Sequence, residues 1–254
     1  MNRDHPYVTA SSIVPEARRL IRDTGASILP VVDEDSGRLL GVVNKFDLVL
    51  MASTRMSTKV TRVMSQATIL LKPNEDVIQA AKRMIEYDVN FTPVVDDDNR
   101  YLGVFSLEDF IGWILDTDID AVDSPLGLLM TSIELAARPW DPLGRIVQAM
   151  VSRRISSIPV IDYKGHILGV VSCHDLIARG SSRAWRHGAP KIIDFMTRPA
   201  ITFLPTHPAF EAMQCIVTRR IARIFITDRE KGRVVGQVSR RILAEAYLKV
   251  KRLA

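Results

Sequence analysis

Cysteine is scarce in this sequence, which has two in 254 residues, Cys173 and Cys215, and neither lies in a CxxC motif. Two unclustered thiols indicate neither a disulfide framework nor a zinc site. We expect both to be small core residues, since free cysteine is commonly buried. The histidines also lack a metal-binding spacing such as HExxH. These absences predict neither a metal site nor a catalytic constellation.

Long apolar runs are missing as well. No run approaches the ~18 residues that a membrane span requires. The first residues, Met1-Asn2-Arg3-Asp4-His5, are followed by no apolar signal region. We therefore expect a cytoplasmic protein with no membrane partner.

Charge is unevenly distributed along the chain, whose formal net charge is +5. Residues 1–127 hold 13 Lys and Arg against 20 Asp and Glu, and the rest of the chain holds 21 against 9. Such asymmetry indicates an anionic partner. It is equally consistent with a solvated basic face, or with an acidic half docking on a basic half.

The strongest pattern is an internal repeat with a period of 66 residues. It relates Met64, Met130 and Met196, then Pro73, Pro139 and Pro205, then Pro93, Pro159 and Phe225. A further copy lies upstream, where residues 28–33 match residues 91–96 at an offset of 63. Such regularity is typical of one supersecondary unit used several times. We predict four repeats, 1–57, 58–120, 121–185 and 186–254, with linkers within 53–62, 116–124 and 178–191.

The second copy gives the plan of one unit. Residues 68–71 are predicted as a short strand that Pro73 stops, and the acidic pair Glu75-Asp76 suits the start of a helix. Apolar residues from Val77 to Ile85 follow at helical spacing. Two β-rich runs, 91–95 and 101–105, flank a polar turn and predict a hairpin, and a last helix begins near residue 106. The predicted order is strand, helix, strand, strand, helix; the first copy keeps only Tyr7-Val8-Thr9 ahead of its helix.

These units resemble CBS domains over nearly the whole chain. The resemblance is carried by the lead-ins Met64-Ser65, Met130-Thr131 and Met196-Thr197, by the Pro-Val-Val-Asp type of strand, and by the hairpin end Gly169–Asp175. It implies an α/β (α+β) fold of four βαββα repeats, paired into two Bateman modules in a disc-like, pseudo-symmetric arrangement. The gamma subunit of AMP-activated kinase and many stand-alone prokaryotic proteins are built in a similar way.

The resemblance implies that AMP, ADP, ATP or S-adenosylmethionine binds in clefts between paired repeats. In the family motif Gly-h-h-Ser/Thr-x-x-Asp, with h hydrophobic, the hydroxyl meets phosphate and the Asp holds the ribose hydroxyls. The motif is complete at Ser106 with Asp109 and at Ser172 with Asp175. The first repeat keeps Asp47 but has Asn44 in place of the hydroxyl residue, and the fourth keeps Ser239 but has Ile242 in place of Asp. At most three clefts are expected to be occupied.

A structural interpretation of the same motif stands beside this one. Ser/Thr-x-x-acid is also the capping box that closes a helix N-terminus. Asn44-x-x-Asp47 would serve as a cap too. The two roles can coexist in one residue.

Arginines distinguish the two modules. Arg223 lies two residues before Phe225, where the resemblance implies a phosphate-binding Arg, and Arg240 follows Ser239 at a helix start. A guanidinium can grip phosphate oxygens through paired N–H donors. We therefore place the best site in the module of repeats 3 and 4, with Asp175 on ribose, Ser172 on phosphate and Arg223 lending charge.

The function favoured by these observations is regulatory: the protein senses an adenosine nucleotide and signals to an unidentified protein partner, with no cofactor required. It is not expected to be an enzyme, because the repeats leave no room for a catalytic domain. One alternative is a nucleic-acid-binding module that uses the basic second half, including Arg179, Arg183, Arg186, Arg219 and Arg220, although Trp185 is almost the sole aromatic among them. Another is an adaptor with empty repeats. Whether two chains form a homodimer stays open.

Overall fold

A computed structural model of the chain describes residues 1–50, 57–119, 123–179, 190–229 and 232–253. Its elements follow the predicted fourfold repetition, with β denoting strands, α helices and η 3-10 helices. Repeat 1 contains β1 (Val8–Thr9), α1 (Val14–Thr24), β2 (Ile28–Val32), β3 (Leu39–Asn44) and α2 (Lys45–Leu50). Repeat 2 contains η1 (Val60–Arg62), α3 (Val77–Glu86), β4 (Phe91–Val95), β5 (Tyr101–Ser106) and α4 (Leu107–Thr117).

The second half has the same order. Repeat 3 contains α5 (Leu126–Leu129), α6 (Leu143–Ser152), β6 (Ser157–Ile161), β7 (Ile167–Ser172) and α7 (Cys173–Arg179). Repeat 4 contains η3 (Ile192–Asp194), β8 (Thr202–Phe203), α8 (Ala209–Arg219), β9 (Arg223–Thr227), β10 (Val234–Ser239) and α9 (Arg240–Leu253). The mixed α/β fold of four βαββα-type units is therefore confirmed.

Each repeat is built around one antiparallel hairpin, and the four hairpins share one register. The pairs at its middle are Pro30 with Val42, Pro93 with Val104, Pro159 with Val170, and Phe225 with Gln237. A bulge or register irregularity occurs near the turn of each. The repetition seen in the sequence is thus a repetition of backbone hydrogen bonding.

The strand predicted over 68–71 was wrong in extent, because the structure has a single parallel bridge there, between Leu71 and Val94. The next ladder bond would need an N–H at Pro93, which proline lacks. The hydroxyl of Thr92 instead donates a 2.7 Å hydrogen bond to the carbonyl of Ile69. Proline in the hairpin therefore stops this edge strand from growing.

Repeats 3 and 4 support that explanation. Repeat 3 has Pro159 at the same place and again forms one bridge, between Ala137 and Val160. Repeat 4 has Phe225 instead, and there β8 extends the pairing to Thr202 opposite Phe225. In repeat 1, which has Pro30, the two-residue strand β1 grows in the other direction, with Val8 opposite Val31 and Thr9 opposite Val32. Pairing opposite the proline position itself therefore occurs in repeat 4, where the missing N–H is restored.

Adjacent repeats exchange their lead-in segments, which we define as the residues around Asn2, Ser65, Thr131 and Thr197. Each lead-in bridges to the hairpin of its partner: Asn2 to Val104, Ser65 to Val42, Thr131 to Gln237, and Thr197 to Val170. Repeats 1 and 2 therefore form one Bateman module, and repeats 3 and 4 form the other.

This exchange explains the glycine of the recurring motif. A Cβ added at any of the four positions would come close to the backbone oxygen of the facing lead-in: 2.6 Å at Gly41, 2.6 Å at Gly103, 2.7 Å at Gly169 and 3.1 Å at Gly236. No larger residue fits without a shift of one backbone segment. The motif glycines are thus required for close approach of the lead-ins.

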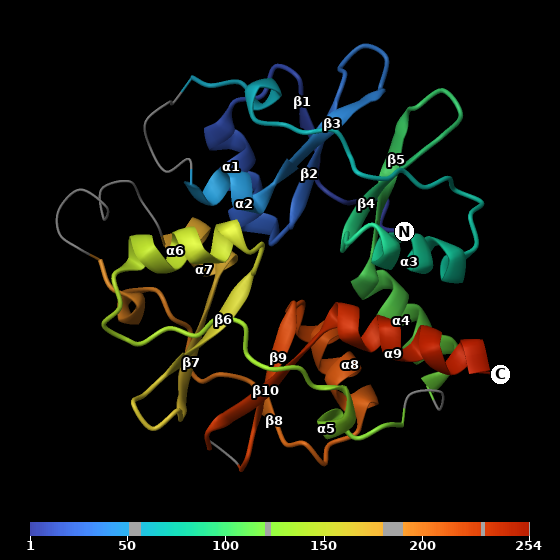
Figure 1. Ribbon diagram of the computed structural model, residues 1–254. Helices are drawn as coiled ribbons and strands as arrows, with labels where there is room; N and C mark the ends of the chain where they lie inside the picture. Colours follow the sequence, from blue (N-terminus) through green and yellow to red (C-terminus); the bar gives the residue numbers. More distant parts are fainter. Residues whose placement is uncertain (51–56, 120–122, 180–189, 230–231, 254) are drawn as a thin grey trace.

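The two hydrophobic cores each join repeats of different modules. One combines repeats 1 and 3, with Ile21 and Leu48 beside Met150 and Leu176. The other combines repeats 2 and 4, where α9 packs on α3 and α4. Figure 1 shows this division, with α1, α2, α6 and α7 on one side of the centre and α3, α4, α8 and α9 on the other. The C-terminal helix therefore packs across modules within the chain.

The two cysteines differ. Cys173 is fully buried, as expected. Cys215 on α8 is only half-buried, which corrects the expectation that both lie in the core. Neither forms a disulfide.

Candidate functional site

A cavity of about 730 Å³ is lined by residues of all four repeats. Such a volume lies within the range of small-molecule sites, roughly 300–1,000 Å³. Six of its lining residues are cationic, namely Lys45, Arg153, Arg154, Arg223, Arg240 and Arg241, and three are acidic, namely Asp47, Asp88 and Glu134. The excess of positive charge makes this central cavity suited to an anion.

The repeat 1 side of the cavity carries the motif residues Asn44 and Asp47. The Asn44 N–H donates to Asp47 Oδ2 over 3.2 Å, and the Asn44 side chain accepts from the N–H of Phe46 over 3.1 Å. Burial raises the pKa of Asp47, opposed by its backbone hydrogen bond and by Arg154. The lead-in of repeat 2, residues 65–69, lines the same side. A carboxylate, an amide and the mainly polar segment Ser65-Gln66-Ala67-Thr68-Ile69 therefore line this side of the cavity.

The repeat 4 side carries Arg223, Ser239 and Arg240. Arg223 Nη1 donates to Gln237 Oε1 over 2.8 Å and lies 4.0 Å from the carboxylate of Glu134. Ser239 Oγ accepts from the N–H of Ile242 over 3.3 Å. Because residue 242 is Ile, no carboxylate of this box competes for the Ser239 hydroxyl proton. Predicted residues of repeats 1 and 4, Asp47, Arg223, Ser239 and Arg240, thus line one cavity.

Arg240 is the most deeply buried cation of the cavity, with a side chain only 6% exposed. Its Nη1 lies 3.3 Å from Glu108 Oε2, and its guanidinium carbon lies 5.1 Å from the ring centre of Phe91. Burial lowers the pKa of Arg240, while Glu108 and Asp109 act in the opposite direction. Burial likewise lowers the pKa of Arg223.

Lys45 faces the same space from the start of α2. Its Nζ donates to Ser27 Oγ over 3.0 Å. Burial, with smaller contributions from Arg240 and Arg223, lowers the pKa of Lys45 to about 8. An anion close to a buried lysine favours its charged form.

The complete motifs of repeats 2 and 3 have another geometry. Asp109 Oδ2 accepts from the N–H and the hydroxyl of Ser106, each over 2.8 Å, and Asp175 Oδ2 accepts from those of Ser172 over 2.9 and 2.5 Å. The serine oxygens accept in return from the N–H groups of Asp109 and Asp175. Both are closed capping boxes, and none of these four residues is among the described residues that line the central cavity.

Sequence reasoning missed four cations of the cavity, Lys45, Arg153, Arg154 and Arg241. Alignment of the four motifs contained a signal for the first: the residue after Asn44, Ser106, Ser172 and Ser239 is Lys45, Leu107, Cys173 and Arg240, respectively. Charge in two repeats and apolar residues in the other two indicate that only two of these positions face an open space.

The arginines of the nucleic-acid alternative are dispersed. Arg179 donates to the carbonyl of Met196 and to the Thr197 hydroxyl. Arg219 and Arg220 are exposed. Arg183, Arg186 and Trp185 lie outside the described residues.

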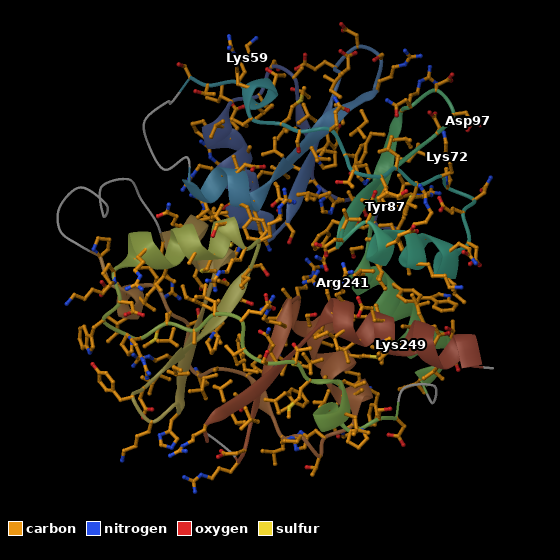
Figure 2. All side chains as sticks on the ribbon, in the orientation of Figure 1. Lys59, Lys72, Tyr87, Asp97, Arg241 and Lys249 are labelled. Atoms are coloured by element: carbon orange, nitrogen blue, oxygen red, sulfur yellow. The ribbon has the colours of Figure 1, made fainter. Side chains whose placement is uncertain are left out.

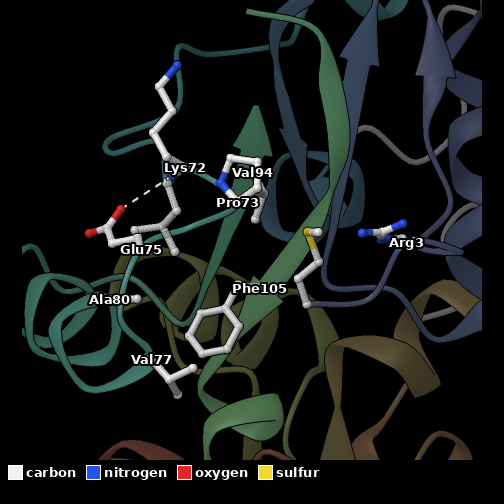
Figure 3. A pocket seen from close by; sticks show the side chains of 10 residues that line it. Arg3, Lys72, Pro73, Glu75, Val77, Ala80, Val94 and Phe105 are labelled. Atoms are coloured by element: carbon white, nitrogen blue, oxygen red, sulfur yellow. Dashed lines mark hydrogen bonds between the residues drawn. The ribbon is translucent and has the colours of Figure 1, made fainter. Parts of the chain in front are cut away.

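A smaller cavity of about 280 Å³ lies beside the start of α3 (Figure 3). Val77, Ala80 and Phe105 form its apolar wall, and the Lys72 N–H donates to Glu75 at its edge. None of the predicted site residues lines it.

Within the described part of the chain, no group of three His, Cys, Asp or Glu side chains could hold a metal ion. Nor does any helix there have the length and apolar character to cross a membrane.

The family model of the CBS domain matches residues 1–52, 60–116, 129–181 and 192–249. The four matches cover most of the chain, which therefore belongs to the CBS domain family. The repeat organisation inferred from the 66-residue period agrees with this membership.

Several known proteins are similar to this chain over most of its length. Protein MJ1225 of Methanocaldococcus jannaschii is 21% identical over 220 residues, 79% of this chain and 77% of that one. The crystal structure of MJ1225, proposed as an archaeal homologue of g-AMPK, matches with a TM-score of 0.86 at 21% identity over 96% of both chains. An uncharacterized protein from Pyrococcus horikoshii matches with a TM-score of 0.65 at 20% identity over 96% of both. These similarities establish the fold.

Other relatives carry enzyme names. A homoserine O-acetyltransferase of Methanohalobium evestigatum is 27% identical over 142 residues, which are 56% of this chain but 26% of that protein. The chain thus spans about a quarter of the length of that enzyme.

Proposed function

We propose that this protein is a regulatory adenine-nucleotide-binding protein whose ligand, AMP, ADP, ATP or S-adenosylmethionine, binds in the central cavity. The observation that carries the proposal is that one cavity of about 730 Å³ combines a motif carboxylate, Asp47, with an excess of arginines. An ionised carboxylate can accept two hydrogen bonds from a ribose diol, and guanidinium groups bind phosphate. Family membership supports the same ligand class.

In this arrangement Asp47 holds the ribose, and the lead-in residues 65–69 contact the base. The phosphates extend toward Arg154, Arg223 and Arg240. The site predicted at Asp175 and Ser172 remains a second proposal, in which a ligand would have to displace the capping hydrogen bonds described above. Asp109 with Ser106 would face the same requirement.

The regulatory role follows from the position of the cavity between two modules. A ligand that contacts both favours the arrangement it fits, provided that it binds the alternatives unequally. A protein partner that contacts both modules would then read the change. No catalytic step is proposed.

Thermal unfolding with a ligand panel tests the proposal. At a hundredfold excess over Kd a ligand adds about 2.7 kcal/mol of stability, or a rise of roughly 5–10 °C in Tm for a chain of this size. Adenosine nucleotides should raise the Tm, and cytidine nucleotides at the same charge should not. No rise with any adenosine compound at millimolar concentration would contradict the proposal.

A second candidate is binding of single-stranded nucleic acid, favoured by two exposed aromatics beside cations. Tyr163 is 88% exposed and lies 5.3 Å from Arg138, and Trp140 is 59% exposed and lies 5.2 Å from Lys191. Stacking platforms next to positive charge bind single strands. Affinity for an oligonucleotide that falls steeply with salt would favour this function.

A further inference from the structure

In three of the four repeats, a segment from the paired repeat covers the loop that precedes helix α1, α8 or α6. We call these covering segments, and they are residues 58–60 on repeat 1, 124–126 on repeat 4 and 190–192 on repeat 3. Their middle residues bridge to the residue before the helix: Lys59 to Ile13, Pro125 to Pro208, and Lys191 to Pro142. The first N–H of each helix donates to the covering segment over 2.8–2.9 Å: Val14 to Thr58, Ala209 to Ser124, and Leu143 to Pro190.

Each covering segment buries one aliphatic side chain at its last residue. Val60, Leu126 and Ile192 are each 0% exposed, and they begin η1, α5 and η3. Their N–H groups donate to the carbonyls of Ser12, His207 and Asp141 over 2.9, 2.9 and 3.2 Å. Val60 lies in the same hydrophobic core as five residues of the repeat that it covers, namely Val8, Val14, Ala17, Val31 and Val43. A covering segment is thus an extended residue and an aliphatic anchor that starts one helical turn.

Repeat 2 has a cavity where the other repeats bury this anchor. The positions equivalent to the five core residues all line the smaller cavity of about 280 Å³ (Figure 3), and they are Leu71, Val77, Ala80, Val94 and Phe105. In the described part of the chain, no residue bonds to the two backbone groups that a covering segment would engage, the carbonyl of Glu75 and the N–H of Val77. An apolar cavity of about 150 Å³ is already large enough to bind benzene. The cavity of repeat 2 therefore has room for an aliphatic side chain.

Exposed side chains stand at the edge of this cavity. Lys72 lines it and forms an ion pair of 3.1 Å with Asp97, and both residues lie at the periphery of the molecule (Figure 2). The described lining residues of this cavity and of the central cavity have no member in common. A segment can therefore enter from outside while the central cavity holds a ligand.

We propose that this cavity is the docking site for a short segment of a protein partner. The segment pairs its backbone with Glu75 and Val77, inserts a Val, Leu or Ile side chain beside Val77 and Phe105, and continues as one helical turn. Its occupant is a peptide and not a small apolar molecule, because the equivalent carbonyl and N–H of the other three repeats are bonded to backbone. Backbone pairing supplies affinity and a side-chain pocket supplies specificity in such docking. The inference goes beyond nucleotide binding and does not rest on it.

Fluorescence anisotropy of a labelled heptapeptide tests the docking site on the full chain. The peptide has the sequence of residues 57–63, which includes the covering segment of repeat 1, and the control peptide carries Val60→Asp. On the protein, Ala80→Leu fills the cavity, because Ala80 lines it and is 4% exposed. Gln79→Leu is the matched control, since it adds the same side chain at the neighbouring, exposed position. The control peptide keeps the test decisive even if Ala80→Leu does not fold.

The unchanged protein should bind the heptapeptide saturably at millimolar concentration. Ala80→Leu should weaken binding about tenfold or more, as should Val60→Asp in the peptide, because each removes the burial of one aliphatic side chain. Gln79→Leu should leave the affinity unchanged. Absence of binding, or equal binding by the unchanged protein and Ala80→Leu, would overturn the docking site, whatever the protein does with nucleotides.

Sedimentation equilibrium of the full chain distinguishes a partner from a second copy of this protein. An oligomeric state that Ala80→Leu leaves unchanged would support a partner. Self-association that Ala80→Leu abolishes would identify a second copy as the occupant and would contradict the proposal.

Discussion

The hydroxyl of Thr197 donates a 2.7 Å hydrogen bond to Oδ1 of Asp175. The lead-in of repeat 4 thereby holds the motif carboxylate of repeat 3, whose other oxygen is bonded to Ser172. Asp47 has a different environment, because it accepts from Asn44 and lines the central cavity. Two carboxylates at equivalent positions of the motif are therefore unequally available to a ligand.

We predict that Asp47→Asn weakens ADP binding by tenfold or more, because a hydrogen bond to a charged group contributes about 1.5–3 kcal/mol. Asp175→Asn should change the affinity less than about twofold and should instead lower the free energy of unfolding by about 1 kcal/mol, as loss of a helix cap does. Calorimetry and urea unfolding of both variants measure the two effects. The reverse order of affinities would favour the site proposed in repeats 3 and 4.

The motif glycines should resist even the smallest side chain. Gly169→Ala would bring a Cβ within 2.7 Å of the Thr197 carbonyl oxygen, so we expect a loss of about 1–3 kcal/mol in unfolding free energy, as overpacking causes. Gly112 in α4 has no atom within 4 Å of an added Cβ, and Gly112→Ala should gain about 0.5–1 kcal/mol. Denaturant unfolding measures both. Equal effects of the two substitutions would refute close approach as the reason for the glycine.

The sequence predicted most of the fold because its strongest signals are local and repeated. Hairpins, amphipathic helices and the 66-residue period needed only spacing and turn residues. The strand predicted at 68–71 was too long because its length depends on a residue far away in the sequence. Pro93 lacks the N–H group that the next hydrogen bond would need. The sequence did not predict that each hydrophobic core joins repeats of different modules. An apolar stripe on a helix shows which face is buried, but not which helix packs against it.

The site was predicted in part for a similar reason. Asp47 and Ser239 were found through the family motif, Arg223 through the wider family resemblance and Arg240 through its place at a helix start, and all four line the central cavity. Lys45 was missed because the motif leaves its position unspecified, and Arg154 was missed because it lies outside the motif; only the convergence of four repeats brings them to one cavity. The closed boxes of Asp109 and Asp175 also depend on side-chain orientation, which spacing does not determine.

Arg154 adopts a left-handed backbone conformation, with φ of 52°. Arg220, 66 residues later, has φ of 51°, and the equivalent residue of repeat 1 is Gly25 with φ of 72°. Non-glycine residues pay roughly 1 kcal/mol in this conformation. Arg154→Gly and Arg220→Gly should each raise the unfolding free energy by up to about 1 kcal/mol, measured in urea.

The two variants should differ in binding. Arg154 lines the central cavity and Arg220 is not among its described lining residues, so only Arg154→Gly should weaken ADP binding, by about threefold to tenfold for an exposed charge. If Arg154→Gly raises the free energy of unfolding and weakens ADP binding, Arg154 lowers the stability of the fold but raises the affinity for the ligand. Unchanged ADP affinity in Arg154→Gly would remove Arg154 from the site.

The lowered pKa of Lys45, about 8, predicts how binding depends on pH. An unfolded chain holds this proton up to the usual lysine range, so between about pH 8 and 10.5 the ligand-free protein gains stability from Lys45 as pH rises. Phosphate raises the pKa of Lys45, so ADP binding takes up a proton above pH 8. The affinity should fall by up to about tenfold per pH unit there.

Other titratable groups also face Lys45. Burial lowers the pKa of Arg223 and of Arg240, and burial raises the pKa of Glu108, with Arg240 acting in the opposite direction. Burial raises the pKa of Cys173 to about 11, so it stays a thiol. Calorimetry at pH 9 in two buffers of different ionisation enthalpy measures the proton uptake. Lys45→Met should abolish it, and uptake that persists in this variant would assign the titration to another group.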